Sequence, residues 1–148
     1  MIDPTPLIDL LHQHLQTQIG QAITPRALEQ RELRAGTAEF EVVGLGEGVD
    51  VGAGNTITGE SIAGYVAFHM ALNSTYGQRL ALAVTINRAL ESFWNNPALE
   101  PYHSVLLDFK VDRAKIFQNP LVNTQSGPLY TITADWTMTV WLETGVTP

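Results

Sequence analysis

The strongest constraint on the fold is a regular alternation near the C-terminal end of the chain, in residues 129–143, LYTITADWTMTVWLE. The even-numbered positions are apolar, whereas the odd-numbered positions from 131 to 139 hold four threonines and Asp135. A period of two predicts a β-strand with one buried face. At roughly 3.3 Å per residue this strand would be about 45 Å long, so we expect its far end to extend beyond its own domain.

Trp141 lies near the end of this strand, on its otherwise polar side. Aromatic side chains are enriched where proteins meet their partners, and an exposed apolar group often marks such a surface. We therefore expect Trp141 to pack against a partner and not in the core.

Two amphipathic helices are predicted from apolar residues that recur at helical spacing. The first ends at Gly20, and the second begins with the capping-box pair Thr75 and Gln78 and ends before Pro97. Both are expected to cover one face of the sheet. Their apolar positions are Leu7, Ile8, Leu11, Leu15 and Ile19 in the first helix, and Leu82, Ile86, Ala89, Leu90, Phe93 and Trp94 in the second.

Between the helices, residues 38–43 and 61–73 alternate as the two strands of a long hairpin do. The stretch 44–59 joins them and holds half of the glycines of the chain, together with Glu47 and Asp50. It lacks the Lys and Ser or Thr of a phosphate-binding loop, and its carboxylates would repel phosphate. We interpret it as a loop between two strands and not as a nucleotide site.

Residues 24–36, here called the arm, are the basic part of the N-terminal half. They are predicted to form a short helix, or a basic segment that leads into the next strand. On a solvated surface, Glu29 and Glu32 would be the local partners of its arginines. The alternative is a patch that docks on the acidic face of a neighbouring subunit. The three arginines are Arg26, Arg31 and Arg34.

No catalytic or metal site is predicted. His12 and His14 are two residues apart, a spacing that does not let them share a metal on a helix, and we interpret them as solvated. His69 alternates with alanines, has no serine or carboxylate at triad-like spacing nearby, and is interpreted as a half-buried strand residue. Cysteine is absent, which removes thiol catalysis and cysteine-bound zinc. We expect no enzymatic activity and no cofactor.

A further strand is predicted at residues 104–111, followed by a polar loop that leads into the final strand. The elements together predict an α+β fold with a mainly antiparallel four-stranded sheet, a long hairpin and helices packed on one face. The length of 148 residues is that of one domain, residues 1–148.

Charge limits the partners of this chain. It carries 15 acidic against 8 basic residues, a net charge of -7, and no Lys or Arg lies between Arg34 and Arg79. Five carboxylates lie in that interval, Glu60 among them. Such a surface repels phosphate, so it disfavours tight binding of nucleic acid but not the passage of DNA. Neither a secretory signal nor a membrane helix is predicted, which is typical of a protein made in a cytoplasm.

The order of elements resembles that of the tail terminator, or tail completion, proteins of long-tailed bacteriophages, the lambda gene-U-like group. The stretches that carry the resemblance are PLIDLLHQHLQTQI, EFEVVGLGEGVDVGAGNTITGESIAGYVAFHMALN, RLALAVTINRALESFWNN and LYTITADWTMTVWLE. The resemblance rests on length, element order and acidic balance over nearly the whole chain, and not on a signature motif.

The resemblance implies a virion protein, made in the host cytoplasm, that forms a ring, usually a hexamer in that family. The ring would cap the finished tail tube, end its polymerisation and join it to the neck connector, with DNA passing through its lumen without specific binding. Another neck, head-completion or tail-tube protein, and a small-ligand-binding protein or enzyme that uses the glycine-rich loop, stay open as alternatives. The residues expected at the subunit or tube interface are Arg26, Arg31, Arg34, Glu47, Asp50, Glu60 and Trp141.

Overall fold

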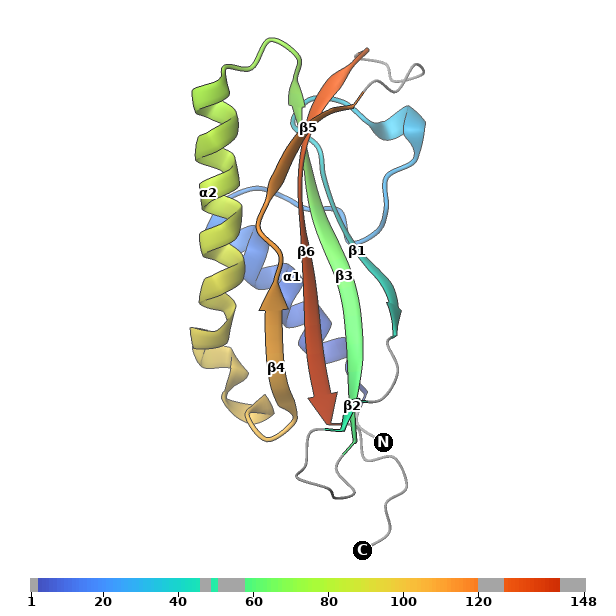
Figure 1. Cartoon of the computed structure of the whole chain (residues 1–148), viewed down its shortest axis with the longest axis vertical. Coiled ribbons are helices and arrows are strands. Elements are labelled where there is room, and N and C mark those ends of the chain that lie inside the picture. The colour runs from blue at the N-terminus through green and yellow to red at the C-terminus, as the bar shows by residue number, and fades with distance from the viewer. Residues whose placement is uncertain (1–2, 46–48, 51–57, 120–126, 142–148) are drawn as a thin grey trace, which may run out of the picture.

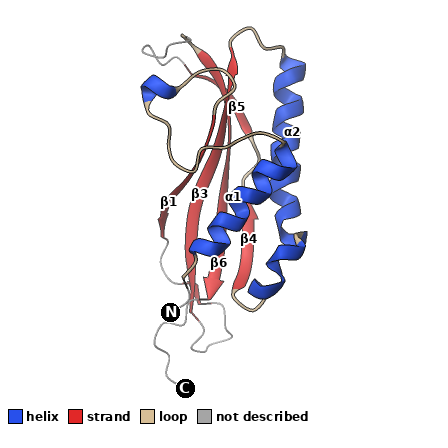
Figure 2. Ribbon diagram, turned by 180° about the vertical axis from the view of Figure 1, so that it is seen from behind, coloured by secondary structure: helices blue, strands red, loops and turns tan. Residues whose placement is uncertain are grey.

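The computed structural model describes residues 3–45, 49–50, 58–119 and 127–141. Its strands form an antiparallel sheet, and its two longer helices lie against one face of that sheet (Figure 1, Figure 2). Both observations confirm the predicted α+β class. Among the described residues, the helices are α1 (Thr5–Ile19), η1 (Gln30–Glu32), α2 (Tyr76–Ser92), η2 (Phe93–Asn95) and η3 (Pro97–Tyr102). The strands are β1 (Ala38–Leu45), β2 (Val49–Asp50), β3 (Thr58–Ala71), β4 (Leu106–Val111), β5 (Lys115–Asn119) and β6 (Leu129–Trp141).

Within the described residues the sheet has six strands, two more than predicted, and the four predicted strands lie side by side in it in the order β1-β3-β6-β4. The other two strands are shorter, β2 beside β3 and β5 beside β6. Strand β5 was not predicted, because Lys115, Gln118 and Asn119 leave Ile116 and Phe117 without an apolar pattern around them. Pairing with β6, and not the residues of β5 themselves, makes this segment a strand.

Strand β6 does not extend beyond its own sheet, contrary to the expectation from its length. It pairs with β3 from Leu129, opposite Ala71, to Trp141, opposite Gly59. The hairpin strand β3 is 14 residues long, so the long final strand finds a partner of its own length within the chain. Residues 142 and 143 of the predicted strand lie outside the described residues.

The end of α1 and the start of α2 are at the predicted residues, whereas α2 ends at Ser92 and the predicted last turn, Phe93–Asn95, is the separate helix η2. Gly20 ends α1 in the left-handed conformation, with φ 76°, and its N–H donates to the Gln16 carbonyl oxygen. Thr75 and Gln78 form the predicted capping box of α2, since each side chain accepts a hydrogen bond from the backbone N–H of the other.

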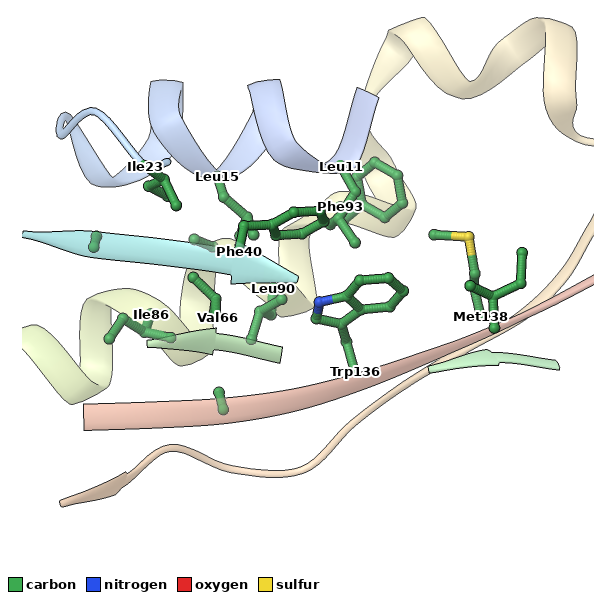
Figure 3. Packing of buried hydrophobic residues seen from close by; sticks show 14 of the residues in the cluster. Leu11, Leu15, Ile23, Phe40, Val66, Ile86, Leu90, Phe93, Trp136 and Met138 are labelled. Carbon is green, nitrogen blue, oxygen red and sulfur yellow. The ribbon is translucent and has the colours of Figure 1, made fainter. Parts of the chain in front are cut away.

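The core lies between the helices and the sheet (Figure 3). At its centre, the Trp136 ring stacks on Phe40, with 5.3 Å between ring centroids and 14° between planes. Trp136 is paired with Gly64 on β3, and its ring occupies the space that a side chain at Gly64 would need. Full burial of each large apolar side chain contributes about 1.5–3 kcal/mol, so this cluster dominates the stability of the fold.

Candidate functional site

The face of the sheet opposite α1 and α2, here called the helix-free face, carries a polar cluster of Glu39, Tyr65, His69 and Thr131. His69 is paired with Thr131 across β3 and β6, and Glu39 lies on the neighbouring strand β1. The His69 Nε2 atom is 3.1 Å from Glu39 Oε2, and its Nδ1 atom is 3.0 Å from Thr131 Oγ1. The Tyr65 hydroxyl donates to Glu39 Oε1 over 2.8 Å. Glu39, His69 and Thr131 are buried.

A neutral His69 satisfies every bond of this cluster. Its Nε2–H donates to the Glu39 carboxylate, which leaves Nδ1 to accept the Thr131 hydroxyl hydrogen. Burial, followed by the bond to Glu39, raises the pKa of the Tyr65 hydroxyl, so that this group stays protonated and remains a donor. The cluster is therefore a closed hydrogen-bond network on three strands.

The arm covers this cluster. Thr24 makes a parallel bridge to β1. The Gly36 N–H donates to the His69 carbonyl oxygen, and the His69 N–H donates to the Thr37 carbonyl oxygen, both over 2.9 Å. Leu28 and Leu33 line a cavity of about 250 Å³ together with the polar cluster. The arrangement fastens the arm to the sheet over the buried Thr131.

Sequence reasoning missed this cluster because its acid and base are far apart in the chain. His69 is fully buried and paired with Glu39, 30 residues before it, and is not a half-buried residue without a partner. In the sequence, this cluster is visible only as Glu39 and His69, two positions in the strands of one hairpin that alternate onto the helix-free face. The hairpin register, which places Glu39 opposite Ala67, brings them together.

The prediction that His12 and His14 are solvated is wrong. His12 Nε2 lies 2.6 Å from the Ile23 carbonyl oxygen. His14 is buried between α1 and the end of α2, with Nε2 2.8 Å from the Ala89 carbonyl oxygen and Nδ1 2.9 Å from the Asn96 side-chain nitrogen. Asn96 keeps its amide oxygen for the Ala98 N–H, so its amide nitrogen faces His14. His14 Nδ1 must therefore accept, which a protonated ring cannot do.

Stability is expected to fall as the pH drops below about 6.5, and His14 should account for part of that fall. Burial lowers the pKa of His14 from its ordinary value of 6.5, against the opposing bond to Ala89. Below about 6.5 the unfolded chain takes up a proton that folded His14 resists, so acid favours unfolding. Urea unfolding from pH 7 to pH 5 should show a shallower pH dependence for H14Q than for H103Q, which alters an exposed histidine. Equal slopes for the two variants would contradict this role.

The arm is not a helix beyond the three residues of η1. Arg26 pairs with Glu32 over 2.8 Å and Arg31 with Glu29 over 2.7 Å, as the local-partner interpretation predicts. The hydrogen bond from Arg26, followed by that from the Glu29 N–H, lowers the pKa of Glu32 to about 2. Both ion pairs are exposed, and such pairs contribute about 0–1 kcal/mol. Arg34 is exposed and has no ion pair within the described residues.

The other predicted interface residues lie at a different end of the molecule. Glu60 and Trp141 are half-buried and lie near the β2 end of the long strands, whereas η1 lies toward the opposite end (Figure 1). The Trp141 N–H donates to the Val105 carbonyl oxygen over 2.7 Å. Glu47 lies outside the described residues, and Asp50 is described only through its backbone pairing in β2. The predicted residues therefore do not form one patch on a single copy.

Comparison with known proteins provides no relative for this chain: no protein-family model and no curated protein matches it. Among the described residues, no three His, Asp or Glu side chains are placed to hold a metal ion. The helices in the described part of the chain are too short or too polar to cross a membrane.

Proposed function

We propose that this chain is a structural virion protein that assembles into a ring, caps the tail tube and joins it to the neck connector. The observation that carries the proposal is the helix-free face. The arm covers the part of this face that carries the polar cluster, and the remaining strands form a wall that copies arranged in a ring would place around a lumen.

The chemistry of the helix-free face suits a wall past which DNA moves. On β6 its accessible positions are Thr133, Asp135, Thr137 and Thr139, and on β3 they are Ser61, Ala63 and Tyr65. Acidic groups outnumber basic ones among the strand residues that alternate onto this face. Glu39 is buried, and the accessible charges on these strands are Glu41, Asp108 and Asp135 against Lys110 and Lys115. Lys110 lies 3.7 Å from Asp108, so the strand part of this face favours phosphate little, and the arginines of the arm lie at its β1 side.

The order of the elements also supports the proposal. A helix, a short arm, a long hairpin, a second helix and closing strands follow one another as in the tail terminator group that the sequence resembles. The short strand β5 is an addition to that order. With this function, the protein would be made in the host cytoplasm and would become part of the virion.

Electron microscopy of the purified chain, alone and with tail tubes of its own phage, tests the proposal. We expect closed rings from the protein alone, and a ring at one end of tubes that no longer lengthen. Open filaments formed by the chain alone would instead identify a tail-tube subunit. A chain that stays monomeric at every concentration, and gains thermal stability saturably on addition of nucleotide, would be a ligand-binding protein.

Charge reversal in the arm should weaken ring assembly, and Arg34 should matter more than Arg31. Arg31 is already paired with Glu29, whereas Arg34 has no such pair among the described residues and is available to a carboxylate of a neighbouring subunit. Native mass spectrometry at low and moderate salt should show fewer rings for R34E than for R31E. If neither variant changes the ring population, the arm does not contact a neighbour.

A further inference from the structure

Helix α2 exposes apolar side chains on a side that does not pack in the core. Tyr76, Leu80 and Val84, here called the helix stripe, are 76%, 53% and 44% exposed. Their spacing of four places them on one side of the helix. A different side of α2, roughly 100° around the helix from this stripe, buries Ile86 and Leu90 in the core. A helix at the surface of a monomer is usually polar on its outer side, so this second apolar side indicates a contact with another molecule.

A second exposed apolar surface lies on β1, the edge strand of the sheet. Val43 and Leu45 are 63% and 70% exposed, and with Val42 they form what we call the edge patch. The outer side of β1 is bridged to Thr24 through Ala38 and Phe40. Beyond Phe40, no strand of the described part of the chain pairs with that side of β1. Unprotected strand edges of this kind are ready sites for association.

The two surfaces lie on opposite sides of the molecule. Figure 1 and Figure 2 both show α2 along one side and β1 along the other, with the rest of the sheet between them. One copy cannot bring them together, but each copy offers one surface to the copy before it and the other to the copy after it. Contacts of this head-to-tail kind produce closed rings when the rotation between copies closes.

The two surfaces end in opposite charges, and the helix surface is about 5 Å longer than the strand surface. From Tyr76 to Arg88 the helix rises about 18 Å, at 1.5 Å per residue. Residues 41–45 of β1 span about 13 Å, at roughly 3.3 Å per residue. Arg88 extends the helix stripe by one turn, is exposed and has no ion pair among the described residues. Glu41 precedes the edge patch, so the two surfaces end in opposite charges.

We propose that the helix stripe of one copy packs against the edge patch of the next copy, and that this contact forms the ring. The inference rests on the proposed function for the existence of a ring, and it adds which surfaces meet. A two-fold contact between two helix stripes would leave both edge patches exposed, whereas the head-to-tail contact covers one surface of each kind at every junction.

Cross-linking between single-cysteine variants tests the contact, because the chain has no cysteine of its own. Protein carrying L80C is mixed with protein carrying L45C and treated with a short bis-maleimide. The matched control is N95C, an exposed position in η2 outside the helix stripe, mixed with L45C. We expect a covalent pair of chains from L80C with L45C, and from neither variant alone nor from the control mixture. A chain carrying both L80C and L45C should form a ladder that ends at the ring.

The outcomes separate the contact from the function. If native mass spectrometry finds rings, but L80C links only to itself or N95C links to L45C as well as L80C does, the proposed contact is wrong and the ring remains. If the unmodified chain is monomeric at every concentration, the proposed function fails and this contact fails with it. Rings together with the specific L80C to L45C link support both.

Discussion

Replacing Gly64 with alanine is expected to destabilise the fold strongly. A Cβ atom at this position would lie 2.6 Å from Trp136 Cε2 and 2.5 Å from the Glu41 carbonyl oxygen. Trp136 is held by its stacking on Phe40, and the Glu41 oxygen is backbone, so neither neighbour moves away easily. Overpacking of this severity costs on the order of 3 kcal/mol or more, a large part of the 5–15 kcal/mol that stabilises a typical domain.

Urea unfolding followed by tryptophan fluorescence measures this effect. Gly44 provides the matched control in the same hairpin, because a Cβ atom there would have no other atom within 4 Å. We expect G44A to change the free energy of unfolding by about 0.5 kcal/mol or less. Similar unfolding midpoints for G64A and G44A would show that Trp136 does not pack against Gly64 as described.

Replacing Glu39 with alanine should destabilise the protein by about 3 kcal/mol. The change removes the acceptor of two donors, the buried His69 Nε2–H and the half-buried Tyr65 hydroxyl. Removal of one partner from a buried, hydrogen-bonded pair costs about 3–5 kcal/mol, and an unsatisfied buried donor about 1–3 kcal/mol. The partly accessible Tyr65 hydroxyl can instead donate to water. We therefore expect a cost at the lower end of the range of about 3–5 kcal/mol.

The arm provides an independent readout of this change. Because Leu28 and Leu33 of the arm lie over the polar cluster, E39A should speed cleavage by trypsin at Arg31 and Arg34. E91A is the control, since Glu91 is exposed on α2 and makes no contact with the cluster, and its effect should stay within about 0.5 kcal/mol. Unchanged cleavage and stability in E39A would mean that the polar cluster does not hold the arm.

Local patterns were sufficient for most of the elements. The alternation in β6 and the capping box at Thr75 identify a strand and a helix start from residues close together in sequence. The local ion pairs of Arg26 and Arg31 were predictable for the same reason, because each partner is within six residues. Elements of this kind depend on interactions between neighbours in the chain.

The missed features all depend on elements that are distant in sequence. His14 is on the less apolar side of α1, and its burial depends on Ala89 and Asn96, more than 70 residues away. The polar cluster and the packing of Trp136 against Gly64 depend on strand register, and a slip of one residue would turn both to the wrong face. A glycine-rich hairpin connection does not specify that register, so it could not be read from the residues alone.

The full-length pairing of β3 and β6 also has a mechanical consequence. Interstrand hydrogen bonds run perpendicular to the strands. A load directed along these strands shears the whole ladder, from Gly59 and Trp141 to Ala71 and Leu129, at once. A load across one end opens the pairs one after another and needs far less force. The molecule is therefore stiff along its long axis, which is the direction of β3 and β6 in Figure 1, and easier to open at the ends of those strands.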